Sequence, residues 1–315
     1  MKPDLVSAGT GMLLEPHHPE LARDFTVHYL PVKREEHEAF LRPIADKVRF
    51  LQTTGGFGAS AAFMDLLPKL EIIASVSVGV DTIDLAHAKK RGIRVTNTPD
   101  VLNDCVADLA IGLMISAARR LAVSDRYVRD GKWLQGNMAI TARVSRKRLG
   151  IVGLGKIGKV IAKRATGFDM TIAYHGRTEQ KDVPYRFYAD LSEMAANVDF
   201  MVIVTPGGAA TKGLVSDKVI RALGPKGILV NVARGSVVDE AALVRALKEG
   251  ALGGAGLDVF AAEPKVPEEL FALETVALTP HVGSATTETR LDMGNLAIAN
   301  LRAYLAGKPL LTPVA

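Results

Sequence analysis

The sequence predicts an α/β protein with two doubly wound parallel sheets. Short β-branched runs alternate with helical segments along most of its 315 residues, and this alternation is typical of parallel sheets covered by helices. Runs such as Phe200–Val204 are apolar at every position, as expected where helices cover both faces of a sheet. The runs are too numerous for one ordinary open sheet, so we expect two domains.

The expected strands follow one another through the chain. They are Thr26–Tyr29, Val48–Leu51, Ile72–Val76, Arg94–Thr96, Leu149–Val152, Thr171–Tyr174, Phe200–Val204, Ile228–Val232, Ala255–Val259 and Val276–Leu278. We expect the chain to leave the first sheet near Pro99. A helical pattern that opens at Ser284 and is closed by Gly307 and Pro309 could return to the first domain. The expected domains are therefore residues 1–100 with 285–315, and residues 101–284.

Composition limits the class of partner. Lys and Arg total 39 against 34 Asp and Glu, a net charge of +5, which suits small anionic ligands and does not indicate nucleic acid. The single cysteine, Cys105, agrees with a reducing cytosol. The segment Met1–Leu14 does not resemble a secretory signal, and the apolar stretch Leu109–Ala118 is shorter than the ~18 residues of a membrane span. We expect a cytoplasmic protein without membrane or nucleic-acid contacts.

Two further polar clusters receive structural interpretations. His17 and His18 stand between two prolines with no other evident ligands, which favours a surface turn over a metal site. The basic run of Arg143, Arg146, Lys147 and Arg148 lacks interleaved aromatics and leads directly into a strand, which favours a solvated domain edge over nucleic-acid binding. We expect no metal site.

A glycine turn predicts dinucleotide binding in the domain of residues 101–284. It has the pattern G-x-G-x-x-G between an apolar strand and a helical pattern. The first glycine permits the tight turn, the second lets the backbone approach a pyrophosphate, and the third lets helix and strand pack closely. The expected cofactor contacts in the turn are Gly153, Leu154, Gly155, Lys156, Ile157 and Gly158.

The next strand end bears on the choice of cofactor. No acidic residue stands at the end of the strand Thr171–Tyr174 to bind the ribose 2′-hydroxyl of NAD; the sequence there reads His175-Gly176-Arg177-Thr178. A guanidinium could hold a 2′-phosphate in a bidentate contact, so NADPH is favoured over NADH. A solvated loop arginine is the alternative.

Three polar residues follow the ends of late strands. Arg234, Glu263 and His281 each come shortly after an apolar run. In open α/β sheets the ligand crevice lies outside the carboxyl ends of the strands, so these side chains should project toward one place. Each could instead serve a loop or turn, but their joint order favours a catalytic set.

With these motifs, the sequence resembles the D-2-hydroxyacid dehydrogenase family over nearly the whole chain. The resemblance rests on Ser77–Asp84, Thr96–Pro99, the glycine turn and the three segments just described. It implies NAD(P)-dependent reduction of a 2-keto acid by a homodimer. It also implies two Rossmann-like domains with the active site in the interdomain cleft, the flavodoxin-like domain of residues 1–100 and 285–315 binding substrate.

The chemistry explains why these residue types suit the reaction. Hydride transfer to the C2 carbon of a keto acid builds negative charge on the carbonyl oxygen, which needs a proton donor and a nearby cation. His281 is the candidate acid, and Glu263 would fix its tautomer and favour the imidazolium. Arg234 would bind the carboxylate and polarise the carbonyl, since its planar fork suits an α-keto acid.

The resemblance also implies supporting positions. It assigns substrate binding to Val78 and Gly79, together with Arg234 and His281. The turn Gly55–Gly58 could help to close that pocket or be a flexible surface loop, and Trp133 could anchor a dimer interface or fill a core. Further implied cofactor contacts are Thr205, Pro206, Val232, Ala233, Asp258 and Gly283.

An NADPH preference in a compact chain resembles the glyoxylate/hydroxypyruvate reductases of the family. The expected function is therefore reduction of glyoxylate or hydroxypyruvate, with the proton from His281. Two alternatives remain open: an NAD-linked D-lactate or phosphoglycerate-type dehydrogenase, and a non-catalytic corepressor that senses dinucleotides.

Overall fold

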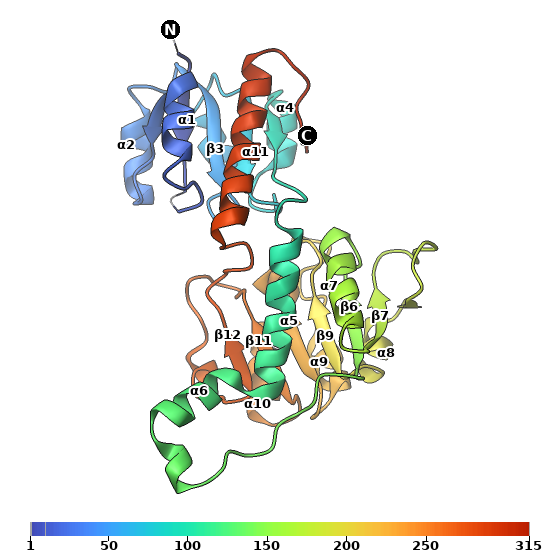
Figure 1. Cartoon of the computed structure of the whole chain (residues 1–315). Coiled ribbons are helices and arrows are strands. Elements are labelled where there is room, and N and C mark those ends of the chain that lie inside the picture. The colour runs from blue at the N-terminus through green and yellow to red at the C-terminus, as the bar shows by residue number, and fades with distance from the viewer. Residues whose placement is uncertain (1, 10, 315) are drawn as a thin grey trace. The chain divides into compact units, whose positions relative to one another are not determined.

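The computed structural model describes residues 2–9 and 11–314. The chain divides into two compact units, Met1–Leu102 with Ser284–Ala315, and Asn103–Gly283. Each unit contains one parallel sheet flanked by helices (Figure 1). The predicted fold class, two Rossmann-like α/β domains, is confirmed.

The first unit has a five-stranded parallel sheet in the order β2-β1-β3-β4-β5. Its strands are β1 (Asp4–Ser7), β2 (Thr26–Tyr29), β3 (Val48–Thr54), β4 (Ile72–Val76) and β5 (Arg94–Thr96). Its helices are α1 (His17–Asp24), η1 (Arg34–Glu36), α2 (His37–Leu41), α3 (Ala61–Asp65), α4 (Leu85–Lys90) and α11 (Thr287–Leu305).

Helices cover both faces of this sheet. Leu51 on β3 belongs to the buried cluster shared with α2, α3 and α4. Its neighbour Phe50 points to the opposite face, where its ring contacts Phe25 after α1 and Tyr304 of α11. Successive side chains of a strand point to opposite faces, so β3 is buried on both sides and its carboxyl end is left for a ligand.

The second unit has a seven-stranded parallel sheet in the order β12-β11-β10-β9-β6-β7-β8. Its strands are β6 (Arg148–Val152), β7 (Thr171–His175), β8 (Arg186–Tyr188), β9 (Phe200–Ile203), β10 (Ile228–Asn231), β11 (Gly254–Leu257) and β12 (Val276–Leu278). Its helices are α5 (Asn103–Arg119), α6 (Leu121–Arg129), η2 (Lys132–Gln135), α7 (Lys156–Thr166), α8 (Leu191–Ala196), α9 (Asp217–Leu223), η3 (Gly235–Val237), α10 (Glu240–Lys248) and η4 (Glu268–Leu270).

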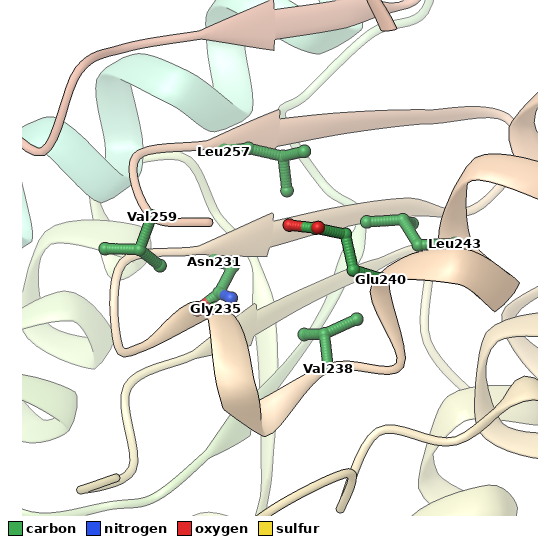
Figure 2. A pocket seen from close by; sticks show the side chains of 7 residues that line it. All are labelled: Asn231, Gly235, Val238, Glu240, Leu243, Leu257 and Val259. Carbon is green, nitrogen blue, oxygen red and sulfur yellow. The ribbon is translucent and has the colours of Figure 1, made fainter. Parts of the chain in front are cut away.

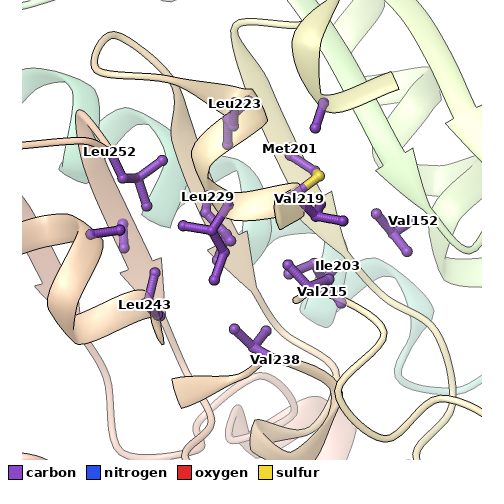
Figure 3. Close-up of a cluster of buried hydrophobic side chains, with 14 of the residues drawn as sticks. Val152, Met201, Ile203, Val215, Val219, Leu223, Leu229, Val238, Leu243 and Leu252 are labelled. Atoms are coloured by element: carbon purple, nitrogen blue, oxygen red, sulfur yellow. The ribbon is translucent and has the colours of Figure 1, made fainter. Parts of the chain in front are cut away.

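The strand order of the second unit reverses between β6 and β9, which is where ligands bind in open α/β sheets. One face of the sheet carries a continuous apolar core with α8, α9 and α10; Met201 and Leu229 pack there with Val219 and Leu243 (Figure 3). On the other face, α5 packs against α7, β10 and β11.

Two strands were missed by the sequence analysis. β1 lies in the middle of the first sheet, paired with β2 and β3, and β8 lies at the edge of the second. β1 has four residues and begins and ends with the polar residues Asp4 and Ser7, and β8 has three. Segments this short carry little periodicity; others as short, such as β5 and β12, were recognised from the sequence, but these two were not.

His17 does not lie in a surface turn, so that expectation was wrong. It is the first residue of α1 and is buried. Its Nδ1 accepts the N–H of Leu14 (2.9 Å), which leaves Nε2 to donate to the carbonyl oxygen of Leu291 (3.1 Å). A Cβ at Gly294 would lie 2.3 Å from the imidazole ring, so this histidine joins α1 closely to α11.

The C-terminal segment extends the first sheet beyond β5. Pro313 forms an antiparallel bridge with Thr96, and the N–H of Val314 donates to the carbonyl oxygen of Val95 (2.8 Å). Unpaired edge strands invite association with other chains, and this segment covers that edge.

No helix in the described residues is long and apolar enough to cross a membrane. The stretch Leu109–Ala118 forms part of α5, whose apolar side chains are largely buried.

Candidate active site

The glycine turn between β6 and α7 has the geometry that a dinucleotide needs. Gly153 has a φ of +100°, and a Cβ there would lie 3.0 Å from the backbone of Thr205. A Cβ at Gly158 would lie 2.3 Å from the carbonyl oxygen of Gly153. Beside Gly155, by contrast, the described part of the chain leaves 4 Å of open space, and no side chain caps the start of α7. The turn therefore fits a pyrophosphate against the N-terminus of α7.

Arg177 and Thr178 lie exposed in the loop after β7. The loop is tied to the glycine turn by Gln180, whose Nε2 donates to the carbonyl oxygen of Leu154 (2.8 Å). The N–H of Gln180 donates to the hydroxyl of Tyr174 (2.6 Å). The loop that carries Arg177 is thus held beside the turn, where the ribose of a dinucleotide lies in this fold.

The sheet brings the three expected catalytic residues to one edge. Arg234 follows β10, Glu263 follows β11 and His281 follows β12. These strands are neighbours and parallel, so their carboxyl ends lie on the same side of the sheet as the glycine turn after β6.

His281 and Glu263 form a hydrogen-bonded pair. Because an ionised carboxylate only accepts hydrogen bonds, the imidazole Nδ1–H donates to Oε2 of Glu263 (2.7 Å). The other carboxylate oxygen accepts the N–H of Phe260 (3.0 Å). Burial alone would raise the pKa of Glu263, but these hydrogen bonds and the charges of His281 and Arg234 outweigh it and hold the pKa below its usual value.

Asp258 holds the loop that carries His281. Its Oδ1 accepts the Thr279 hydroxyl (2.7 Å) and the N–H of Val282 (2.8 Å), and its Oδ2 accepts the N–H of Gly283 (2.9 Å). His281 itself has a backbone φ of +53°, a conformation that residues other than glycine rarely adopt. Burial raises the pKa of Asp258 even though these hydrogen bonds favour its ionised form.

The loop that carries Arg234 is fixed by its own backbone and by Asn231. The buried Asn231 side chain accepts the N–H of Ala233 (3.0 Å) and donates to the carbonyl oxygen of Arg234 (3.0 Å). A Cβ at Gly235 would lie 1.9 Å from the carbonyl carbon of Phe260. The loops after β10 and β11 are therefore in direct backbone contact.

The other expected cofactor contacts occupy strand ends of the second unit. Thr205 and Pro206 follow β9, with Thr205 directly against the turn at Gly153. Val232 and Ala233 follow β10 and are buried, so they offer mainly backbone to a ligand. The roles of these residues, and of Asp258 and Gly283 toward a cofactor, stay predictions.

In the first unit, Val78 and Gly79 follow β4. Neither of their amide N–H groups donates a hydrogen bond to another residue that the structure describes. Consecutive unpaired N–H groups suit a carboxylate, which is the role expected for this loop.

The turn Gly55–Gly58 lies beside that loop. A Cβ at Gly55 would lie 3.1 Å from the Cβ of Ser77, and the ring of Phe57 lies 5.2 Å from that of Phe63, centroid to centroid. The Thr53 hydroxyl donates to the carbonyl oxygen of Gly58 (2.6 Å). The segment is thus an anchored turn.

Sequence reasoning missed Glu240, in the first turn of α10. Its Oε1 accepts the N–H of Ala261 (2.9 Å), which joins α10 to the loop carrying Glu263. Figure 2 shows Glu240 pointing into a cavity of about 10 Å³ beside Asn231 and Leu257, with room for about one water. A glutamate in a first helical turn is expected on helix-dipole grounds alone, so the sequence gives no sign of this contact.

No group of three or more His, Cys, Asp or Glu side chains within residues 2–9 and 11–314 is placed to hold a metal ion.

A parallel sheet with this glycine turn is typical of nicotinamide-dependent oxidoreductases. Residues 111–283, more than half of the chain, match the family model of the D-isomer specific 2-hydroxyacid dehydrogenase NAD binding domain. The chain belongs to this family of enzymes.

Its relatives are named reductases and dehydrogenases. Hydroxyphenylpyruvate reductase of Plectranthus scutellarioides is 51% identical over 275 residues, covering 87% of this chain and 88% of the relative. Glyoxylate/hydroxypyruvate reductase A of Arabidopsis thaliana is 51% identical over 279 residues, 89% of each chain. These names favour an enzyme over a non-catalytic corepressor.

Solved structures show the same architecture. The NADPH-dependent glyoxylate/hydroxypyruvate reductase of Sinorhizobium meliloti, in complex with NADP and malonate, has a TM-score of 0.91 at 38% identity and covers 100% of this chain and 97% of its own. The 2-hydroxyacid dehydrogenase of Ketogulonicigenium vulgare has a TM-score of 0.92 at 41% identity, covering 100% and 99%.

Proposed function

We propose that this protein reduces a small 2-keto acid, glyoxylate or hydroxypyruvate, to the 2-hydroxy acid with NADPH. The observation that carries the proposal is the His281–Glu263 pair, at the sheet edge that also bears Arg234 and the glycine turn. The reductase names of relatives about half identical to this chain support the substrate class.

Each residue of the site has a separate role in the proposed reduction. The bound cofactor supplies the hydride. Since Nδ1 of His281 donates to Glu263, Nε2 is the nitrogen left to give a proton to the carbonyl oxygen of the substrate. Arg234 binds the carboxylate and offsets the charge that develops on that oxygen. In the first unit, the loop of Val78 and Gly79 offers N–H groups that suit the carboxylate of such an acid.

Arg177 supports the choice of NADPH. The loop after β7 presents this guanidinium and Thr178, and no acidic side chain ends β7 to repel a 2′-phosphate. The related Sinorhizobium meliloti structure holds NADP.

The function is tested by the loss of reduced-nicotinamide absorbance with each cofactor. Glyoxylate, hydroxypyruvate, hydroxyphenylpyruvate and pyruvate are assayed in parallel. Fastest turnover of glyoxylate or hydroxypyruvate with NADPH is expected. A faster reaction with pyruvate and NADH would instead point to a D-lactate-type enzyme, and no turnover with any pair would overturn the proposal.

Arg177→Ala is expected to lower the ratio of kcat/KM for NADPH to that for NADH by about tenfold to a hundredfold, because charge-assisted hydrogen bonds contribute about 1.5–3 kcal/mol. The matched control is Arg186→Ala on β8, whose guanidinium stacks on Tyr188 and should leave the ratio unchanged. An unchanged ratio in Arg177→Ala would place the cofactor preference elsewhere.

We further propose that the protein is a homodimer joined through the segment Leu121–Thr141. Helices α6 and η2 in this segment contain no buried residue. Trp133 is 64% exposed, so it does not fill a core, and Leu134 and Ile140 are 94% and 99% exposed. Beside them, α5, residues 139–145 and Phe168 line a groove of about 550 Å³. Exposed apolar surface of this extent is typical of an interface.

The double variant Leu134→Asp, Ile140→Asp is expected to be a monomer of 33.6 kDa where the parent is a dimer, because it places two charges in the apolar contact. Light scattering after size-exclusion chromatography measures the mass. Val32→Asp, at an apolar position 81% exposed in the first unit, is the control and should stay dimeric. A double variant with the mass of a dimer would rule out this segment as the interface.

A further inference from the structure

The loop of Val78 and Gly79 is oriented by hydrogen bonds to its carbonyl groups. The N–H of Thr98 donates to the carbonyl oxygen of Ser77 (2.9 Å), and Nδ2 of Asn97 donates to that of Val78 (2.9 Å). In a planar trans peptide the C=O and the following N–H point in opposite directions. Both bonds therefore turn the N–H groups of Val78 and Gly79 away from the end of β5.

Asn97 is itself fixed by the C-terminal segment of the chain. The hydroxyl of Thr312 donates to the carbonyl oxygen of Asn97 (2.6 Å), and the N–H of Asn97 donates to that of Thr312 (3.3 Å). Residues more than two hundred positions apart are thus joined at the end of β5.

Asn300 of α11 holds the C-terminal segment in place. This fully buried side chain accepts the N–H groups of Leu311 (3.0 Å) and Thr312 (3.1 Å) through Oδ1. Its Nδ2 donates to the Thr312 hydroxyl (2.8 Å) and to the carbonyl oxygen of Leu296 (3.0 Å). The amide accepts two hydrogen bonds and donates two, which satisfies it completely. The C-terminal segment is therefore held in one well-defined position.

We propose that Asn97, held by Thr312 and Asn300, is a positioning residue that aims the N–H of Gly79 at the carboxylate of the keto acid, next to the N–H of Val78 that the bond from Thr98 orients. The proposal rests on the proposed function, in which this loop binds that carboxylate. It adds that the last residues of the chain set the affinity for the acid without touching it.

The test is the separate effect of variants on substrate and on cofactor. Asn97→Ala is expected to raise KM for the keto acid about five- to tenfold, the effect of losing one hydrogen bond. The KM for NADPH should stay within twofold, since the glycine turn belongs to the other unit. Calorimetric titration of the NADPH-loaded protein with oxamate, an unreactive keto-acid analogue, should show the same rise in Kd.

Thr312 provides an isosteric pair of variants. Thr312→Val keeps the shape but removes the hydroxyl, and should raise KM for the keto acid about threefold or more because Asn97 and Asn300 each lose a partner. Thr312→Ser keeps the hydroxyl and should stay near the parent. Arg302→Met, which breaks the ion pairs of α11 with Glu20 and Asp24 but does not contact Asn97, controls for lost stability and should keep KM.

The possible results distinguish a failure of the role of Asn97 from a failure of the proposed keto-acid reduction. Parental KM and oxamate Kd in a folded Asn97→Ala protein that still reduces keto acids would overturn the role of Asn97 alone. An equal rise in KM for cofactor and substrate would do so too. A parent protein that neither reduces keto acids nor binds oxamate would overturn both.

Discussion

His281→Ala is expected to lower kcat for keto-acid reduction by about 10³-fold, within the range that general acid–base catalysis contributes. The carbonyl oxygen then lacks its proton donor, while the glycine turn is untouched, so the Kd for NADPH should stay within twofold. Steady-state kinetics and cofactor titration measure the two quantities. Retention of more than about a tenth of the parental kcat would remove His281 from the acid role.

His87→Ala is the matched control for that variant. His87 lies in the first unit and forms a similar pair with Asp65 (2.8 Å), but it belongs to α4 and is not one of the residues proposed to bind substrate or cofactor. It should keep parental kcat, which shows that losing a histidine–carboxylate pair is not by itself harmful.

Glu263→Gln tests the contribution of the carboxylate charge to the His281–Glu263 pair. The lowered pKa of Glu263 keeps it ionised to lower pH than an ordinary glutamate, so the pair contributes stability above the unfolded pKa that is lost as pH falls through the folded value. Glutamine still accepts the hydrogen bond from the imidazole Nδ1–H but carries no charge that acid could remove. We therefore expect acidification below the usual pKa of a glutamate to lower Tm less in this variant than in the parent, measured by thermal unfolding across pH; an equal loss of Tm in both proteins would mean that ionised Glu263 does not stabilise the pair.

Gly158→Ala is expected to abolish tight cofactor binding and to destabilise the second unit. Its Cβ would lie 2.3 Å from the carbonyl oxygen of Gly153, so α7 must move away from the turn. Such overpacking costs about 1–3 kcal/mol, which lowers Tm by several degrees. We expect NADPH affinity to fall at least about a hundredfold, measured by calorimetry beside thermal unfolding.

Gly155→Ala separates an effect on NADPH binding from an effect on the stability of the fold. Gly155 has an ordinary φ of −80°, and the described residues leave its Cβ position open, so Tm without cofactor should not change. The methyl group occupies the space through which the backbone approaches the pyrophosphate, and NADPH affinity should fall about tenfold or more. Parental affinity in this variant would mean that the dinucleotide does not lie over the turn.

The placement of the proposed catalytic residues at one edge of the sheet could be predicted from the ends of the strands. Arg234, Glu263 and His281 each follow a recognisable apolar strand, and parallel strands deliver such residues to one edge. The residues that hold the functional loops in place could not be predicted in this way. Glu240 and Asn97 act through hydrogen bonds to the backbone of distant loops, and the partner of such a bond depends on the tertiary fold.

The same distinction explains which strands could be predicted from the sequence. The strand β4 is apolar at four of its five positions, whereas the central strand β1 is identified by its two neighbours in the sheet. Its four residues have little intrinsic preference, since strand propensity largely measures the fit to a surrounding sheet.

The route of the chain through its two units sets an order for folding during synthesis. The second unit is one uninterrupted stretch, Asn103–Gly283, whereas the first needs Ser284–Ala315 as well. On the ribosome the second unit can therefore form its core while the face of the first sheet that α11 covers is still open. Domains fold as units while the chain emerges, so the first unit, most of which is translated before the second, is completed after it.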